Sequence, residues 1–301
     1  MPDAPVAPGA VVGFVGLGNM GAPMASLMSA AGYAVQGFDV HEGARAAFAA
    51  QSGRSAAGSL AQAASDARVV VLMLPNSEVV EDVLLAGGLL DAVPDGALIV
   101  DMSSSDPTRT LELADEAERR GRGLVDAPVS GGVVGARNGT LTIMVGGRED
   151  QFAAVEPLLG TMGRKVLHVG GVAAGHAMKA LNNLLSGSTL LITSEAVSVA
   201  RRFGLDPELM VDVINGSSGR SYSTEHKFPD FVFPGNYGSG FGVRLQVKDM
   251  RIALELARAT GVPVPFTEAS VELWERAMEA LPADADHTEI ARWVEAGGDG
   301  R

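Results

Sequence analysis

A lysine and an asparagine stand four residues apart in the segment Lys179-Ala180-Leu181-Asn182-Asn183. If this segment is helical, both side chains lie on one helix face. A lysine whose pKa is lowered by burial or by a nearby cation can exchange a proton with a substrate oxygen, and Lys248 is a candidate for that cation. Only four lysines occur in the chain, against nineteen arginines, which favours a specific use for those present. The alternative is a lysine that snorkels from the helix start into solvent.

A glycine pattern near the start of the chain is typical of a phosphate-binding loop. Gly16, Gly18 and Gly21 follow the apolar run Val11–Val15 and precede a segment of helical composition. Gly16 permits a tight turn, Gly18 lets the backbone approach a pyrophosphate, and Gly21 allows a helix to pack closely on a strand. The free N–H groups of the helix N-terminus then face the phosphates. The pattern therefore predicts a dinucleotide site.

Asp39 stands at the end of the second predicted strand, about twenty residues after the glycine pattern. A carboxylate at this place binds a ribose 2′-hydroxyl and repels a 2′-phosphate, so it favours NAD over NADP. Arg45 is near enough in sequence to keep NADP as the less favoured choice. The alternative is a glycine turn in a flavodoxin-like sheet, with Asp39 as a cap.

A second turn can hold an anion. Ser130, Gly131 and Gly132 follow a predicted strand. Successive backbone N–H groups in such a turn form an anion-binding concavity, to which the serine hydroxyl adds a donor. A plain turn is the equal alternative. The five histidines lack the spacing of a metal site, and no Gly-x-Ser-x-Gly or Walker A run is present.

Strands and helices alternate through the first half of the chain. The expected strands are Val11–Val15, Ala34–Val40, Arg68–Leu74, Ala97–Met102, Leu124–Ala127, Leu141–Val145 and Val166–Val169. The expected helices are Ala22–Ala31, Glu42–Gln51, Ser77–Leu85, Pro107–Arg120 and Asp150–Leu158. The alternation predicts an α/β fold, a doubly wound, largely parallel sheet of Rossmann type with helices on both faces.

After Gly175 the pattern becomes helical throughout. The expected helices are Ala177–Phe203, Pro207–Asn215, Arg244–Thr260, Phe266–Ala280 and Thr288–Glu295, with Trp274 and Trp293 in the core. We therefore expect a Rossmann-type domain in residues 1–172 and an all-helical domain in residues 173–301, entered through a long helix. That helix is apolar on most of its circumference, and a second subunit is a candidate to cover it.

Composition excludes several classes of protein. The net charge of −13 argues against binding to nucleic acid or to an anionic membrane. Cysteine is absent, which excludes disulfides and fits a reducing cytoplasm. The first residues lack the pattern of a secretory signal, and the longest apolar stretch, Leu184–Val199, is too polar to span a bilayer. We expect a soluble, cytoplasmic protein.

In order, these motifs resemble the β-hydroxyacid dehydrogenase family, which includes 3-hydroxyisobutyrate dehydrogenase and tartronate semialdehyde reductase. The resemblance covers residues 11–296. Its motifs are Gly13-Phe14-Val15-Gly16-Leu17-Gly18-Asn19-Met20-Gly21, Met73-Leu74-Pro75-Asn76, Asp101-Met102-Ser103-Ser104, Asp126-Ala127-Pro128-Val129-Ser130-Gly131-Gly132, Gly139-Thr140-Leu141, Lys179 with Asn183, and Lys248-Asp249. Several motifs in the same order are far more specific than any one of them.

The resemblance implies an NAD-dependent enzyme that moves a hydride between nicotinamide and a short 3-hydroxy acid or its semialdehyde. It implies that Lys179 is the general acid/base, that Asn183 orients the substrate, and that Ser130, Gly131 and Gly132 cradle its carboxylate. The residues implied to line the dinucleotide are Leu17, Asn19, Met20, Leu74, Pro75, Asn76 and Ser104, with Lys248 near the nicotinamide end. Homodimers or homotetramers are implied as well.

Differences in detail separate similar families. The 6-phosphogluconate dehydrogenases carry Lys-x-x-His-Asn where this chain has Lys179 to Asn183, and imine reductases usually lack the lysine. Two alternatives stay open, a reductase of bulkier aldehydes or imines and a dinucleotide-sensing module without turnover. Arg220, in a Gly/Ser-rich segment, either pairs with an anionic or polyhydroxylated substrate tail or is an ordinary surface arginine.

Overall fold

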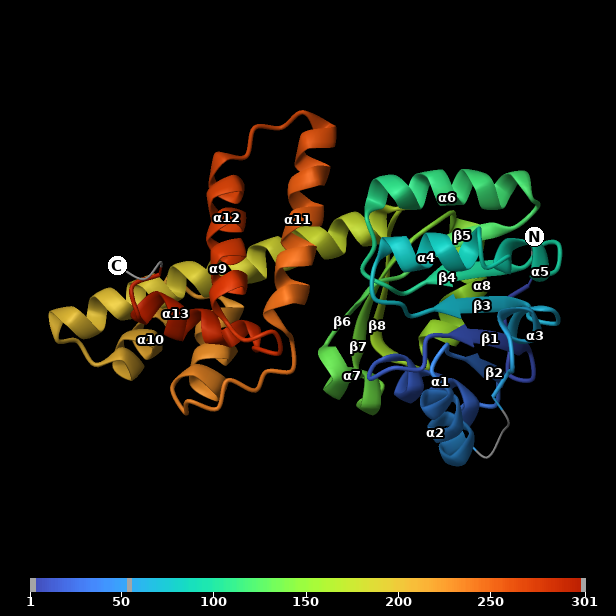
Figure 1. Ribbon diagram of the computed structural model, residues 1–301, viewed down its shortest axis with the longest axis horizontal. Coiled ribbons are helices and arrows are strands. Elements are labelled where there is room, and N and C mark those ends of the chain that lie inside the picture. The colour runs from blue at the N-terminus through green and yellow to red at the C-terminus, as the bar shows by residue number, and fades with distance from the viewer. Residues whose placement is uncertain (1–3, 53–55, 299–301) are drawn as a thin grey trace. The chain divides into compact units, whose positions relative to one another are not determined.

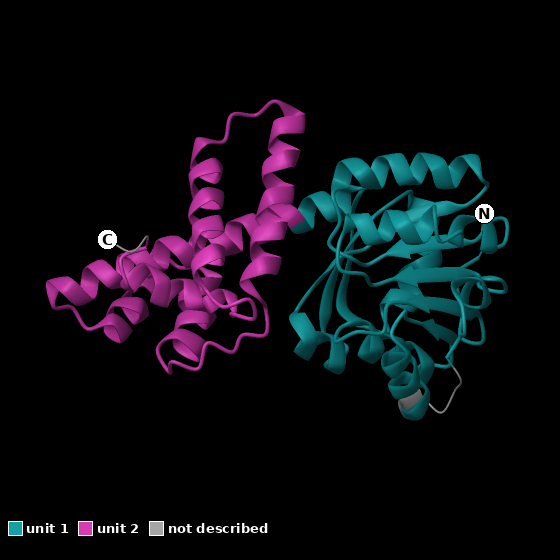
Figure 2. Cartoon of the chain, in the orientation of Figure 1, with its two compact units in different colours: residues 1–179 teal, residues 180–301 magenta. Residues whose placement is uncertain are grey.

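The computed structural model describes residues 4–52 and 56–298. The chain divides into two compact units, residues 1–179 and 180–301 (Figure 2). Each unit has its own hydrophobic core. The division falls inside the 30-residue helix α9 (Ala174–Phe203), whose first residues belong to unit 1.

Unit 1 is built on an eight-stranded sheet. Its strands are β1 (Val11–Val15), β2 (Ala34–Phe38), β3 (Val69–Leu72), β4 (Leu98–Asp101), β5 (Gly123–Asp126), β6 (Val129–Ser130), β7 (Leu141–Gly146) and β8 (Gly163–Gly170). Their order is β2-β1-β3-β4-β5-β7-β6, and β8 pairs with β7. Strands β1 to β5 run parallel, whereas β7 is antiparallel to β5 and β6. The expected largely parallel sheet is confirmed.

Helices cover both faces of this sheet, because alternate strand residues point to opposite sides. Val69 and Val71 of β3 join a core with α1 and α8, while Val70 and Leu72 join a second core with α4 and α6. The helices are α1 (Gly21–Ala30), α2 (Glu42–Ser52), α3 (Leu60–Ala64), α4 (Ser77–Leu84), α5 (Leu89–Ala92), α6 (Pro107–Arg119), α7 (Gly132–Asn138) and α8 (Glu149–Leu159). Figure 1 shows α4 and α6 on one side of the strands and α1 on the other. The doubly wound fold is confirmed.

The sheet has a switch point between β1 and β3. From β1 the chain goes to its neighbour β2 on one side and then returns to β3 on the other side. Open α/β sheets bind ligands beyond the carboxyl ends of the strands at such a point. In this sheet the two segments at that point are the glycine loop after β1 and the residues that follow Leu72 at the end of β3.

Unit 2 is helical, as expected. Besides the rest of α9 it contains α10 (Pro207–Asn215), the π-helix η1 (Ser223–Val232), α11 (Val243–Thr260), α12 (Pro265–Ala280), the 3₁₀ turn η2 (His287–Glu289) and α13 (Ile290–Glu295). Trp274 is fully buried and Trp293 nearly so, which confirms both as core residues. The sequence predicts none of the short elements α3, α5, β6 and α7, nor η1.

Candidate active site

Of the three glycines in the loop between β1 and α1, Gly18 is the one with open space beside it. Gly16 has a φ of +98°, and a Cβ there would collide with the carbonyl oxygen of Met73. A Cβ on Gly21 would collide with the carbonyl oxygen of Gly16, because α1 begins directly against the loop. A Cβ on Gly18 would meet no atom within 4 Å. Open space beside a glycine at a helix N-terminus suits a pyrophosphate, so the loop fits a dinucleotide.

Asp39 fastens the glycine loop to the end of β2. One of its carboxylate oxygens accepts a hydrogen bond from the Leu17 N–H at 2.8 Å, and the other accepts one from the His41 N–H at 2.8 Å. Arg45 donates to the backbone oxygen of Asp39 at 2.6 Å, and its guanidinium lies 5.8 Å from the centre of the Phe38 ring. The carboxylate and the arginine are therefore both held at this strand end.

The loops that follow β3 and β4 are linked. The Leu74 N–H donates to Ser103 Oγ at 3.0 Å. Asn76 caps α4, since its side-chain oxygen accepts from the Val79 N–H at 3.0 Å. The other residues implied by the resemblance to line the dinucleotide belong to these loops and to the glycine loop, and they are Asn19, Met20, Pro75 and Ser104.

The Ser-Gly-Gly segment is a strand end followed by a helix rather than a bare turn. Ser130 ends β6, Gly131 precedes α7 with a φ of +130°, and Gly132 begins α7 with a φ of +59°. Both glycines are exposed. Left-handed conformations of this kind favour glycine, so the sequence Gly131-Gly132 is explained by the backbone itself. The exposed N–H groups here suit a carboxylate.

Lys179 and Asn183 both lie on α9, one turn apart, as predicted. Lys179 is half-buried and stands six residues into the helix, within unit 1. Asn183 is buried and belongs to unit 2.

Asp249 orients two of the candidate residues within unit 2. Its Oδ2 accepts from Asn183 Nδ2 at 2.5 Å, and its Oδ1 lies 3.2 Å from Lys248 Nζ. Gln246 donates to the backbone oxygen of Asn183 at 2.9 Å. Asp249 is itself buried, and its carboxylate fixes the positions of the Asn183 amide and the Lys248 ammonium group. Sequence reasoning includes Asp249 only as part of a motif and gives it no role.

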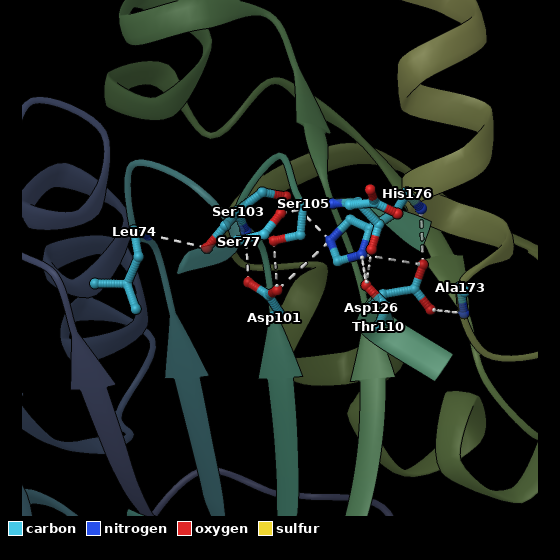
Figure 3. A network of polar contacts seen from close by, with 10 residues as sticks. Leu74, Ser77, Asp101, Ser103, Ser105, Thr110, Asp126, Ala173 and His176 are labelled. Carbon is cyan, nitrogen blue, oxygen red and sulfur yellow. Dashed lines mark hydrogen bonds and ion pairs between the residues drawn. The ribbon is translucent and has the colours of Figure 1, made fainter. Parts of the chain in front are cut away.

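A buried polar network joins the ends of β4 and β5 to the start of α9 (Figure 3). Asp101 ends β4, and its carboxylate accepts from the Ser103 N–H at 2.9 Å and from Ser105 Oγ at 2.9 Å. Asp126 ends β5, and its carboxylate accepts from the N–H groups of Ala173 and His176, each at 2.7 Å. Burial raises the pKa of the Asp126 carboxyl, and nearby His176 opposes that rise.

The ring of His176 lies between these two carboxylates. Its Nε2 donates to the Ser103 carbonyl oxygen at 3.1 Å, and its Nδ1 lies 2.8 Å from Thr110 Oγ1. The carboxylate oxygens of Asp101 and Asp126 are 3.7 and 3.9 Å from the ring nitrogens. Sequence reasoning missed this network because its members are distant in the chain. The only local signal is that each aspartate is the last residue of an apolar strand.

Arg220 lies in the exposed segment between α10 and η1, in unit 2. Its side chain is 63% exposed, and its Nε is 3.6 Å from Glu225 Oε1. This geometry matches an ordinary surface arginine, and a role toward a substrate stays a prediction.

Within residues 4–52 and 56–298, no helix is both long and apolar enough to cross a membrane. Over the same part of the chain, no group of three or more His, Asp and Glu side chains comes together as a metal site requires.

Comparisons with known proteins agree with this geometry. Residues 11–170 match the family described as the NAD-binding domain of 6-phosphogluconate dehydrogenase, and residues 173–294 match that described as NAD-binding of NADP-dependent 3-hydroxyisobutyrate dehydrogenase. The chain is 43% identical to 2-(hydroxymethyl)glutarate dehydrogenase of Eubacterium barkeri, over 88% of each chain. It is 42% identical to human mitochondrial 3-hydroxyisobutyrate dehydrogenase, over 84% of this chain and 77% of that protein.

A solved structure is similar over nearly the whole chain. It is 3-hydroxyisobutyrate dehydrogenase of Mycobacterium tuberculosis with L-serine, with a TM-score of 0.90, 33% identity, and coverage of 96% of this chain and 100% of that one. The protein described here belongs to the β-hydroxyacid dehydrogenase family. It is an oxidoreductase of the 3-hydroxyacid dehydrogenase class.

Proposed function

We propose that this protein is an NAD-preferring dehydrogenase of a short 3-hydroxy acid, or a reductase of the matching semialdehyde, with Lys179 as general acid/base. One arrangement in unit 1 carries the proposal. The glycine loop, the loops after β3 and β4, and the start of α9 all lie at the carboxyl ends of the parallel strands, since Asp126 ends β5 and binds the first turn of α9. Lys179 follows on the next turn.

Each group has a defined task in this reaction. A bound nicotinamide supplies the hydride acceptor, and the chemistry of hydride transfer is its own. Lys179, as the neutral amine, takes the hydroxyl proton while the C–H bond of the carbinol breaks. The backbone N–H groups and hydroxyl at Ser130–Gly132 hold the substrate carboxylate, and Asn183 orients the hydroxyl. Holding the carbon in place is the contribution of proximity.

We propose NAD as the preferred cofactor, with Asp39 as the selecting residue. Its carboxylate is fixed beside the glycine loop, where it would repel a 2′-phosphate. Arg45, the residue that could favour NADP, is bonded to backbone carbonyl oxygens at the same strand end.

We further propose the division of labour between the two halves of the chain and a homodimer or homotetramer. Residues 1–172 would be the NAD-binding domain, and residues 173–301 would be a substrate and oligomerisation domain. Support for the contact comes from exposed apolar side chains on α9, among them Val199 and Phe203. A cytoplasmic location is part of the same proposal, since a chain without cysteine fits a reducing compartment.

The first experiment follows NAD⁺ and NADP⁺ reduction at 340 nm with a panel of hydroxy acids. The panel contains 3-hydroxyisobutyrate, serine, glycerate, threonate, 3-hydroxypropionate, 4-hydroxybutyrate and a sulfonate analogue. We expect Lys179→Ala to lower kcat by roughly 10²–10⁴ with NADH binding nearly unchanged. Lys165→Ala, a change at an exposed lysine of β8, is the matched control and should retain full activity.

Other outcomes contradict the proposal in distinct ways. Full turnover by Lys179→Ala would exclude it as the general acid/base. Activity only on cyclic imines or bulky aldehydes would favour the carbonyl- or imine-reductase alternative. NADH binding without turnover of any compound would favour a dinucleotide-sensing module.

A further inference from the structure

The carboxylate of Asp126 binds the start of α9 to the sheet. Asp126 accepts from the N–H groups of Ala173 and His176, which stand before and within the first turn of the helix. Such N–H groups have no partner within a helix, so Asp126 satisfies donors that burial would otherwise leave unpaired. Ala173 has a φ of +71°, an unfavourable conformation for a residue with a side chain. The chain is therefore turned sharply here in order to start α9 at this place.

Glycines permit the close approach of this helix to the strands. A Cβ on Gly175 would collide with the carbonyl oxygen of Met144 on β7 and would lie 2.8 Å from Asp126 Oδ2. A Cβ on Gly146 would lie 2.8 Å from the Gly175 nitrogen. The first turn of α9 thus rests directly on β5 and β7, and its distance from them is fixed.

His176 fixes the rotation of that turn. Its side chain is fully buried, and both of its ring nitrogens are engaged. Nε2 reaches the loop after β4 at Ser103, and Nδ1 reaches α6 at Thr110, whose hydroxyl also lies 2.9 Å from the carbonyl oxygen of Asp106. A planar ring held at both ends leaves the helix little freedom to turn about its axis.

The same network reaches the loop after β3. Ser103 contacts His176 through its carbonyl oxygen and Leu74 through its hydroxyl, at 3.1 and 3.0 Å (Figure 3). Leu74 belongs to the segment proposed to line the dinucleotide. One serine therefore connects that segment with the first turn of the helix that carries Lys179.

We propose that His176 is a positioning residue: through Ser103 and Thr110 it fixes the rotation of α9, and with it the direction of the Lys179 side-chain nitrogen relative to the loops after β3 and β4. The inference rests on the proposed function of Lys179. His176 is not itself catalytic, because its buried nitrogens are bonded to protein groups. Its neighbour by one helical turn is Lys179. A displacement of about 1 Å of a catalytic group can cost 10²-fold in rate, so small rotations matter.

A double-mutant cycle tests this proposal. The variants are His176→Leu, Lys179→Ala and the two together, assayed with NAD⁺ and the most active hydroxy acid of the panel. We expect His176→Leu to lower kcat about 10- to 100-fold and to change KM for NAD⁺ less than about threefold. Adding Lys179→Ala to His176→Leu should then lower kcat much less than Lys179→Ala does in the wild type, because a misdirected Lys179 already contributes little to kcat.

Conservative and control variants separate positioning from general destabilisation. His176→Gln retains a donor for the Ser103 carbonyl and should restore kcat to within about threefold of the wild type. Thr110→Val breaks the contact at the Nδ1 end of the ring with little change of shape, and should lower kcat less than His176→Leu does. It takes the place of His176→Leu in the test if that variant does not fold. His168→Leu on β8 is the control, since the Nε2 of His168 also bonds to a backbone oxygen, that of Gly147, at 2.7 Å.

A second readout needs no turnover. The rate of acetylation of each lysine by acetic anhydride, followed by mass spectrometry in the protein alone, reports the surroundings of Lys179. We expect at least about a threefold change in the acetylation rate of Lys179 in His176→Leu and none at the exposed Lys165. A structural role unconnected with Lys179 would leave both rates unchanged.

The outcomes are separable. If Lys179→Ala lowers kcat and the two losses simply multiply, with unchanged acetylation, the positioning role is wrong and the proposed function stands. If Lys179→Ala leaves kcat intact, both the general-base role and the positioning role are wrong. A non-multiplicative cycle with altered acetylation at Lys179 supports the inference.

Discussion

The carboxylate of Asp39 shows how one side chain of unit 1 can serve structure and selectivity together. It accepts hydrogen bonds from Leu17 and His41 and presents its charge beside the glycine loop. We expect Asp39→Ser to raise the ratio of kcat/KM for NADP⁺ to that for NAD⁺ by at least about tenfold, which corresponds to about 1.4 kcal/mol. The measurement is initial rates with both cofactors. Serine retains an acceptor for one of the two N–H groups, so the loop should persist.

Two controls accompany Asp39→Ser. Glu42→Gln removes an exposed negative charge at the start of α2 without touching the glycine loop, and should leave the ratio unchanged. Asp39→Asn keeps the shape of the side chain and removes its charge, and should shift the ratio in the same direction. A wild-type enzyme that already prefers NADP⁺ would contradict the selection by Asp39.

At the scale of the elements, the junction of β1 and α1 allows effects on folding and effects on dinucleotide binding to be tested separately. Gly18→Ala places a Cβ in open space, so the fold should be unaffected, with Tm within about 2 °C of the wild type. The same Cβ would occupy the place of a pyrophosphate, and we expect NADH to bind at least about tenfold more weakly by fluorescence titration. Gly21→Ala differs, because its Cβ collides with the Gly16 carbonyl oxygen and should destabilise the fold.

Gly43→Ala is the matched control for Gly18→Ala. Its Cβ also meets no atom within 4 Å, but Gly43 lies in α2 outside the loop. It should leave NADH binding intact and stabilise the helix slightly. Unchanged NADH affinity in Gly18→Ala would show that the dinucleotide does not approach the loop at this residue.

Elements with a strong local pattern are predictable from the sequence, and elements made by tertiary contacts are not. Strand β1 and helix α10 have the predicted bounds, because apolar runs and caps mark them. The π-helix η1 contains Pro229, a residue that argues against a helix, and it is stabilised by burial of Phe228. Nothing local in the sequence reveals that burial.

The same contrast holds for the candidate site. Lys179 and the glycine loop are found from local motifs, since each needs only a strand or helix to place it. The bond from Asp126 to the His176 N–H joins residues 50 apart, and it exists because β5 ends beneath the start of α9. Only the strand order and the packing of that helix bring the two together, so sequence spacing could not reveal the network.

At the level of the whole molecule, a stripe of exposed apolar side chains on α9 has no cover within the part of the chain that the structure describes. Leu185, Ile192 and Val199 recur every seven residues, and Phe203 follows one turn later. Their exposed fractions are 66%, 50%, 68% and 81%. Seven-residue spacing keeps side chains on one helix face, the pattern of helices that pair with another helix. This stripe supports a contact between copies of the chain.

Breaking the stripe tests that contact. We expect the double variant Ile192→Asp and Val199→Asp to lower the mass measured by size-exclusion chromatography with light scattering, because carboxylates in an apolar contact lose their hydration. A weakening of the subunit Kd by at least about 100-fold, or about 2.7 kcal/mol, is expected. Val40→Asp alters a 78% exposed valine of unit 1 and should leave the mass unchanged. A wild type that is monomeric at micromolar concentration, or a double variant of undiminished mass, would show that this stripe does not form a contact between copies of the chain.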